Sequence, residues 1–307
     1  MERSFKPHQI NLRNPQNYKV NWNLGRLTVI IKRIAFLTFQ NLILICIGLS
    51  MFLLCEFMVL KRDYPPLTGK RSVLQMRPSL TILPRPDSLT STIRYRNRKR
   101  YSYGKYIHDL YGFTQTYERH LENSELTDCT HFSSYINDPK YSCKFSLDKS
   151  SLGCHIGNHY GYEDLNPCIL VHLNRVIGWI PEFKENEQNH SSPNRYSTIK
   201  IKCEGIHDFD KENVGKICYY DEESGIPGNY AALQSEKNGC NSNYGQIRRY
   251  YYPYIKQINY QTPFVWVKIS GTTRNVVIMI QCWAFTNDVE SNINEEFPNA
   301  RFEILID

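Results

Sequence analysis

One long apolar stretch stands out in the pattern of hydrophobic and polar positions along the chain. Residues 34–55, IAFLTFQNLILICIGLSMFLLC, include no charged side chain. At 1.5 Å per residue, a helix of this segment measures roughly 33 Å, which is enough to cross a bilayer. A cleaved signal peptide begins nearer the N-terminus and has a shorter apolar core. The stretch therefore predicts an uncleaved signal anchor, a transmembrane helix over residues 34–60.

Two neighbouring amides, Gln40 and Asn41, interrupt the apolar stretch near its N-terminal end. Amides in hydrocarbon usually face another helix, and Cys46 and Ser50, with Gly48 near them, would permit a close helix contact. The pattern favours packing against a partner helix. The alternative is an ordinary anchor that tolerates two amides near its end.

The chain after the anchor is predicted to be a stalk followed by a β-rich domain. Five prolines break residues 61–100, which are expected to form an extended, solvated stalk. Apolar side chains recur every three or four positions over residues 102–121, which predicts one face of a helix. Strand-forming runs with turn signals between them follow at residues 264–269, 275–285 and 301–306. We expect residues 101–307 to be a mainly β, antiparallel β-sandwich with one packed helix.

Charge is concentrated before the anchor. The 307 residues have a net charge of +7, and residues 1–33 alone, with seven basic residues and one acid, carry +6. This arm favours a cytoplasmic N-terminus. The rest of the chain is nearly neutral, so a nucleic-acid-binding body is not indicated. A mean hydropathy of −0.49 excludes a protein with many membrane spans.

Cysteines and a glycosylation signal support the same orientation. Eight of the ten cysteines follow the anchor, an even number that suits a disulfide framework in an oxidising compartment. The sequon at Asn189 lies on the same side. We therefore expect a single-pass type II membrane protein with its C-terminus lumenal or extracellular. The alternative is a reducing ectodomain with free thiols.

Two patterns raise the question of metal binding or catalysis, and both are weak. Asp208-Phe209-Asp210 has the D-x-D spacing that could hold a metal and a nucleotide sugar, but no strand–helix alternation surrounds it. His155 and His159 are four residues apart, but three nearby glycines favour a loop over a helix. The motifs of serine hydrolases, zincins and P-loop proteins are missing from the sequence. The chain is expected to be a binding or assembly protein without catalytic, cofactor-binding or metal-binding residues.

Four blocks of residues follow the anchor in a characteristic order. They are IRY with YSYGKY (93–106); CKF, GC, YGY and NPC leading into LNRVIGWIP (143–181); KCEG with DKENVG (202–215); and YYPY with Cys282 and RFE (251–303). Their order and spacing resemble those of the β subunits of sodium/potassium- and proton/potassium-transporting P-type ATPases. The resemblance implies an immunoglobulin-like extracellular sandwich.

The resemblance also implies a set of disulfides, which the cysteine spacing alone could not have chosen from 105 pairings. The implied pairs are Cys129–Cys143, Cys154–Cys168 and Cys203–Cys282, the last of which is expected to join the first strand region to the last. Cys218 and Cys240 have no counterparts in the family pattern and bracket an apparent insertion. We expect a fourth disulfide between them, with unpaired thiols or a bond to another chain as the alternatives.

The function implied by the resemblance is that of a non-catalytic accessory subunit. Such a β subunit binds a catalytic α subunit, with or without a small regulatory subunit, assists its folding, assembly and delivery to the plasma membrane, and modulates potassium transport. The partner-binding residues implied are Phe36, Phe39, Gln40 and Asn41 in the span, where the family has tyrosines, and Tyr251, Tyr252, Pro253 and Tyr254 outside it. The alternative is a cell-adhesion or junction glycoprotein that uses the same fold without a pump.

Overall fold

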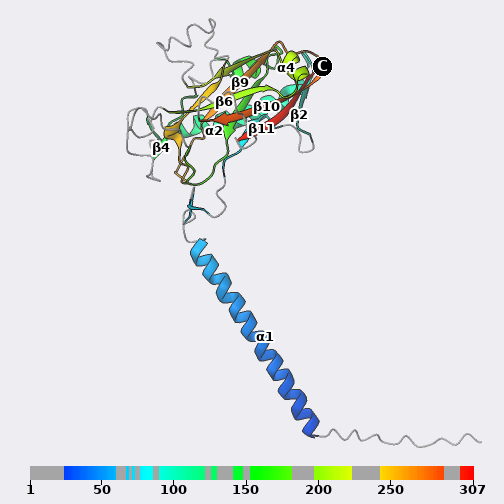
Figure 1. Cartoon of the computed structure of the whole chain (residues 1–307), viewed down its shortest axis with the longest axis vertical. Helices are drawn as coiled ribbons and strands as arrows, with labels where there is room; N and C mark the ends of the chain where they lie inside the picture. Colours follow the sequence, from blue (N-terminus) through cyan, green and yellow to red (C-terminus); the bar gives the residue numbers. More distant parts are fainter. Residues whose placement is uncertain are drawn as a thin grey trace, which may run out of the picture. The chain divides into compact units, whose positions relative to one another are not determined.

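The computed structural model divides the chain into two compact units, Met1–Arg62 and Asp63–Asp307 (Figure 1). It describes residues 24–59, 67–68, 71–72, 77–85, 90–121, 126–129, 141–147, 153–181, 197–222, 243–286 and 298–307. The described part of the first unit is one helix, α1 (Leu24–Val59). Its segment Leu27–Met58 is long and apolar enough to cross a membrane, and its side chains are exposed. The predicted apolar helix is therefore present.

Two main β-sheets form the second unit. One has the strand order β1-β5-β9-β7 and the other β2-β11-β10-β6-β8, and β3 and β4 form a small third sheet. The strands are β1 (Leu80–Leu83), β2 (Thr92–Tyr95), β3 (Leu126–Thr127), β4 (Ser142–Cys143), β5 (Cys168–Leu173), β6 (Thr198–Gly205), β7 (Lys216–Tyr220), β8 (Gly245–Arg248), β9 (Phe264–Ser270), β10 (Val277–Phe285) and β11 (Asn299–Ile306). The helices are α2 (Arg100–Leu121), α4 (Asp208–Asn213), and the 3-10 turns η3 (Ile156–Gly161) and η4 (Arg249–Tyr251).

The two main sheets pack face to face around one hydrophobic core. In β6, apolar or small residues alternate with polar ones, so that every second side chain is buried against the other sheet. The Tyr219 hydroxyl links the sheets: it accepts a bond from the Cys203 N–H at 2.7 Å and donates to the Cys203 carbonyl at 3.2 Å. The sheets approach so closely at Gly245 that an added Cβ would lie 2.2 Å from a Val265 methyl.

Helix α2 covers the outer face of the four-stranded sheet. Phe113 and Tyr117 of α2 pack edge-on or tilted against one another and against Phe264 of β9. The Tyr117 hydroxyl also donates to the Thr262 carbonyl at 2.5 Å. Because α2 and the second sheet cover its two faces, β9 is buried along most of its length and reads as an apolar run.

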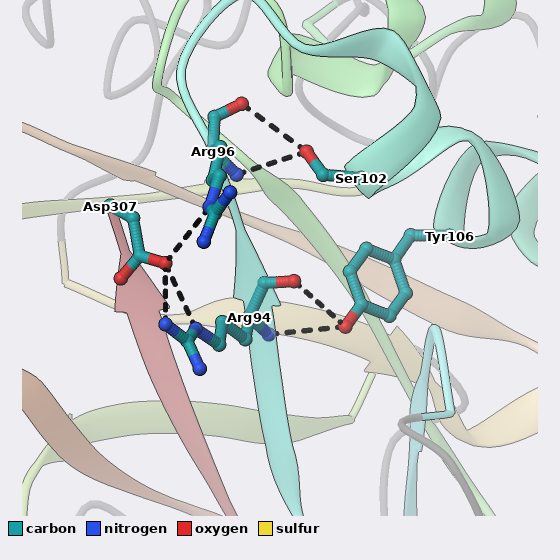
Figure 2. Close-up of polar contacts among 5 residues, drawn as sticks. All are labelled: Arg94, Arg96, Ser102, Tyr106 and Asp307. Atoms are coloured by element: carbon teal, nitrogen blue, oxygen red, sulfur yellow. Dashed lines mark hydrogen bonds and ion pairs between the residues drawn. The ribbon is translucent and has the colours of Figure 1, made fainter.

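The start of α2 is fastened to the five-stranded sheet as well. The Tyr106 hydroxyl accepts a bond from the Arg94 N–H at 3.1 Å and donates to the Arg94 carbonyl at 3.2 Å (Figure 2). The rings of Tyr106 and Tyr103 both stack on Tyr162, next to Tyr95. The predicted helix over residues 102–121 is confirmed, and its apolar stripe is the face that packs here.

Part of the expected stalk belongs to the sheets, so that the prediction of a solvated stalk is wrong for two segments. β1 pairs with β5, and β2 pairs with β11, with Ile93 and Tyr95 buried. The prolines exclude a helix but flank β1, at Pro78 and Pro84, and do not interrupt it. The purely antiparallel sandwich is also wrong, because β2 runs parallel to β11 and β3 parallel to β4.

Three disulfides are formed, and they are the pairs that the resemblance implies: Cys129–Cys143, Cys154–Cys168 and Cys203–Cys282. Cys203 on β6 lies directly opposite Cys282 on β10. The expectation that this bond joins the first strand region to the last is wrong, because β6 and β10 are neighbours within one sheet. Cys218 is disulfide-bonded, but Cys240 and the sequon Asn189 lie outside the described residues, so the fourth bridge and glycosylation stay predictions.

We predict that Tyr106→Phe destabilises the second unit although it retains the ring. It leaves the Arg94 N–H and carbonyl without the phenol that bonds both, a loss of about 1–2 kcal/mol, or about 2–8 °C in the unfolding midpoint. The measurement is thermal unfolding of the full chain in mild detergent. Tyr101→Phe is the control, because Tyr101 is 76% exposed and should tolerate the change. Equal midpoints for the two variants would contradict the role of the Tyr106 hydroxyl.

We predict a larger loss when Cys203 and Cys282 are both replaced by alanine than when Cys129 and Cys143 are. The first bond closes a segment of 79 residues and the second one of 14. The chain-entropy contributions are about 4.5 and about 3 kcal/mol. Unfolding midpoints of both double variants under non-reducing conditions test the order, and the reverse order would show that local packing outweighs loop length.

Candidate functional site

Helix α1 presents its polar residues on different faces. At about 100° per residue, Phe36, Phe39 and Gln40 fall on one face of the helix, whereas Asn41 lies about 100° from Gln40. The helix therefore brings together three of the four residues expected to bind a partner, and not the fourth. It also separates Gly48 from the Cys46–Ser50 pair, so the three do not form the single close-contact face that the sequence suggested.

The two amides of α1 lack the internal partners that its hydroxyls have. Thr38 donates to the Ala35 carbonyl at 2.9 Å, and Ser50 to the Ile47 carbonyl at 2.8 Å. Within the described part of the chain, the Gln40 and Asn41 side chains make no hydrogen bond. An unpaired amide is costly in hydrocarbon. Gln40 and Asn41 are thus the positions of α1 where a second helix would relieve the largest cost.

The expected extracellular contact at residues 251–254 is mostly inside the domain. Tyr251, Tyr252 and Pro253 are buried, and Tyr254 is half-buried. The Tyr251 hydroxyl donates to Glu222 at 2.6 Å, and the Tyr252 ring packs edge-on against Trp179. Three of the four side chains are therefore part of the core, and a contact of this segment with a partner stays a prediction.

An arginine holds this segment to the loop that follows β5. The Arg175 guanidinium lies over the rings of Tyr254 and Tyr260, at 5.6 and 5.4 Å from their centroids. Its Nε donates to the Thr262 hydroxyl at 2.8 Å. The Gly178 N–H donates to the Tyr254 carbonyl at 2.8 Å, with a positive φ of 71° that favours glycine. We call these two loops, residues 174–181 and 252–262, the Arg175 loop pair.

Arg175 lies within the motif LNRVIGWIP, but the sequence did not predict its contacts with the tyrosines. The arginine lies in one loop, and Tyr254 and Tyr260 lie in a second loop about 80 residues later. No pattern of residue spacing predicts that two such distant loops come together. A cavity of about 400 Å³ opens beside Arg175, lined also by Thr116, Tyr117, Gln257, Asn259, Tyr260 and Gln261. Its lining is polar and aromatic, which suits binding of a polar surface more than of a lipid chain.

The titratable groups near the loop pair are structural. Burial, followed by the Glu222 carboxylate, raises the pKa of Tyr251 well above its ordinary value, and burial does the same for Tyr252. Burial lowers the pKa of His172. These phenols therefore stay neutral at physiological pH, and none of them is poised as an acid or base.

The two weak metal patterns of the sequence have structural explanations. Asp210 is 2% exposed and accepts bonds from the His207 N–H at 3.0 Å and the Met279 N–H at 2.9 Å, which fix α4 to β10. Asp208 is 98% exposed and lies beside Lys211. His159 pairs with Glu163 at 2.6 Å. Among the described residues, no group of three or more histidines, cysteines or carboxylates is placed to hold a metal ion.

Among the described residues, one apolar helix long enough to span a membrane is followed by a disulfide-bonded, β-rich domain, which is consistent with the class of single-pass membrane proteins. Residues 31–303 match the family described as sodium/potassium ATPase beta chain. The chain belongs to this family, whose members are non-catalytic subunits.

Individual relatives agree with the family match. The chain is 27% identical to the probable sodium/potassium-transporting ATPase subunit beta-3 of Caenorhabditis briggsae, covering 79% of this chain and 70% of that protein. It is 25% identical to subunit beta-2 of Drosophila melanogaster, covering 82% and 77%. It is 27% identical to subunit beta-2 of Rhinella marina, covering 74% and 70%.

We predict that Arg175→Lys weakens the Arg175 loop pair even though it keeps the charge. Lysine cannot lie flat on two rings while donating a directed bond to Thr262. The expected loss is about 1–2 kcal/mol, seen as a lower unfolding midpoint and faster proteolysis of the loops. Lys256→Arg, at an exposed position of the same loop pair, is the control. An unchanged midpoint in Arg175→Lys would show that the charge alone suffices.

Proposed function

We propose that this chain is the accessory β subunit of a sodium/potassium-transporting ATPase. It assists folding, assembly and plasma-membrane delivery of a catalytic α subunit and modulates potassium transport. The observation that carries the proposal is the family match over residues 31–303, together with an apolar helix whose amides lack partners. ATP hydrolysis belongs to the α subunit in this account.

The proposed topology is single-pass type II, in the plasma membrane. Residues 1–33 are cytoplasmic, α1 crosses the bilayer, and the disulfide-bonded second unit is extracellular. The basic arm, the three disulfides and the sequon at Asn189 support this orientation. The two face-to-face sheets support an immunoglobulin-like sandwich as the extracellular fold.

We place the intramembrane contact on the helix face of Phe36, Phe39 and Gln40. On this face, the two phenylalanine rings would pack against a helix of the α subunit, and the Gln40 amide would form a hydrogen bond with it. That bond would satisfy an amide that has no partner within α1. Asn41, on another face, is a separate contact in this proposal. If this chain binds the folded α subunit but not the unfolded one, it shifts the folding equilibrium of α toward the folded state by mass action. A difference in contact between two pump conformations would also shift potassium affinity.

The extracellular contact is proposed at the exposed rim of the Arg175 loop pair. Ile180 and Ile258, one on each loop of the pair, are 45% and 57% exposed and could contact a partner. Tyr254, which is half-buried, helps to hold the two loops together because Arg175 lies over its ring. Tyr251 and Tyr252 support this rim from the core and do not themselves meet the partner.

The test is co-purification of an α subunit with this chain after co-expression and solubilisation in mild detergent. We expect the wild type to retain α, and Gln40→Leu to retain severalfold less because one buried amide contact is lost. Thr38→Val is the matched control: it also removes one polar group from the span, but one already bonded within the helix. Asn41→Leu reports separately on the second face.

Three outcomes would contradict parts of the proposal. A wild-type chain that folds, reaches the surface and retains no α would overturn the accessory role and favour the adhesion glycoprotein. Equal loss in Gln40→Leu and Thr38→Val would overturn a directed contact at Gln40. Full retention by an Ile180→Ser, Ile258→Ser double variant would overturn the extracellular rim.

A further inference from the structure

The corner between β2 and α2 carries the densest charge of one sign in the described second unit. Five basic side chains lie within seven residues and are all exposed; they are Arg94, Arg96, Arg98, Lys99 and Arg100, here called the basic corner. Asp307 is the carboxylate that pairs with them in the described structure (Figure 2). Its Oδ2 lies 2.8 Å from Arg94 Nη2 and 3.6 Å from Arg96 Nε.

The backbone of the basic corner is fixed by hydrogen bonds. The Ser102 hydroxyl accepts from the Arg96 N–H at 3.0 Å (Figure 2). It also donates to the Lys99 carbonyl at 2.7 Å. The Asn97 N–H donates to the Asp307 carbonyl at 3.0 Å. Tyr106 holds Arg94 on the other side. The backbone that carries the cations is therefore held in place, so that a ligand would need to order only their side chains.

Three of the five cations contribute no contact to the fold. Arg98, Lys99 and Arg100 make no side-chain hydrogen bond or ion pair with any part of the chain that the structure describes. Lys99 and Arg100 lie at the start of α2, whose first turn has no acidic residue. The positive end of the helix dipole and the neighbouring cations repel them. These charges therefore lower the stability of the fold, and a bound anionic ligand would offset that loss by neutralising them.

Few acidic groups near the basic corner offset these charges. Burial and the Glu163 carboxylate raise the pKa of Tyr103, and Arg100 opposes that rise, so Glu163 and Arg100 act on the same ring. Glu163, however, is paired with His159 at 2.6 Å. Glu303 accepts a bond from Thr92 at 2.5 Å. Both carboxylates keep their charge in these contacts, but together with Asp307 they are three side-chain carboxylates against five cations, so the corner stays net positive.

The exposed surface of the corner favours a sugar polyanion over the other anions. Guanidinium groups bind sulfate and carboxylate in a bidentate fashion. Tyr101, 76% exposed among the cations, offers a ring face on which a sugar can stack. An acidic protein segment would also need apolar pockets for anchoring side chains, and Tyr101 is the only large apolar side chain exposed in residues 90–106.

We propose that the basic corner binds a sulfated polysaccharide of the extracellular matrix type. Its repeated sulfates would contact Arg98, Lys99 and Arg100, and Arg94 and Arg96 would extend the positive strip along β2. This site rests on the proposed extracellular topology, because such polymers are found outside the cell. It does not involve the proposed contacts with the α subunit.

The test uses the full chain in nanodiscs of zwitterionic lipid, with immobilised heparin as the probe. We expect binding that weakens as salt is raised, because counterions are released from a polyanion. The triple variant R98Q/K99Q/R100Q should bind about tenfold more weakly or worse and show a shallower salt dependence. The control K144Q/K202Q/K211Q removes the same charge from positions away from both the corner and the Arg175 loop pair, and it should bind as the wild type does.

Several outcomes would overturn the proposal. Equal weakening in both triple variants would show a non-specific charge effect. Binding of poly-glutamate as tight as that of heparin would assign the corner to acidic protein segments. Binding to phosphatidylserine vesicles but not to heparin would assign it to a lipid surface. Co-purification of α with the wild-type chain is measured in parallel. A wild type that retains α but does not bind heparin overturns only this site, and one that binds heparin but retains no α overturns only the accessory role.

Discussion

The constraint on which the rest of this structure depends is an apolar helix that the chain itself does not cover. The side chains of Leu27–Met58 are exposed, and water is a poor solvent for them. A bilayer satisfies the apolar residues but not the amides of Gln40 and Asn41. In the proposed function, α1 therefore has two tasks, to anchor the chain and to meet a partner helix within the membrane.

The second unit uses tyrosine hydroxyls as its main connectors. Tyr219 joins the two sheets, Tyr106 fastens α2 to β2, Tyr117 fastens α2 to the chain before β9, and Tyr251 bonds to Glu222. Each phenol buries a large ring and pairs its one polar atom. These four hydroxyls connect segments that are far apart in the sequence or belong to different elements. The burial of large rings explains why YYPY belongs largely to the core, where the rings support the exposed rim of the Arg175 loop pair.

Much of the fold could be predicted because local patterns determine it. The uncharged span gave α1, the three-and-four spacing gave α2, and β-branched runs gave β9, β10 and β11. Other features depend on contacts between distant segments, which periodicity does not encode. The strands β1 and β2 are only four residues long, and their pairing with β5 and β11 comes from tertiary contacts. The burial of Tyr252 and the position of Arg175 over Tyr254 and Tyr260 likewise follow only from the assembled loops.

The measurement that tests the central claim most directly is the amount of α subunit at the cell surface with and without this chain. Surface biotinylation of cells that express an α subunit alone, or together with this chain, gives that ratio. A partner that binds only folded α shifts its folding equilibrium, so the account predicts severalfold more surface α in the presence of the chain. Equal surface α in both cells, with the chain itself folded and at the surface, would contradict the account.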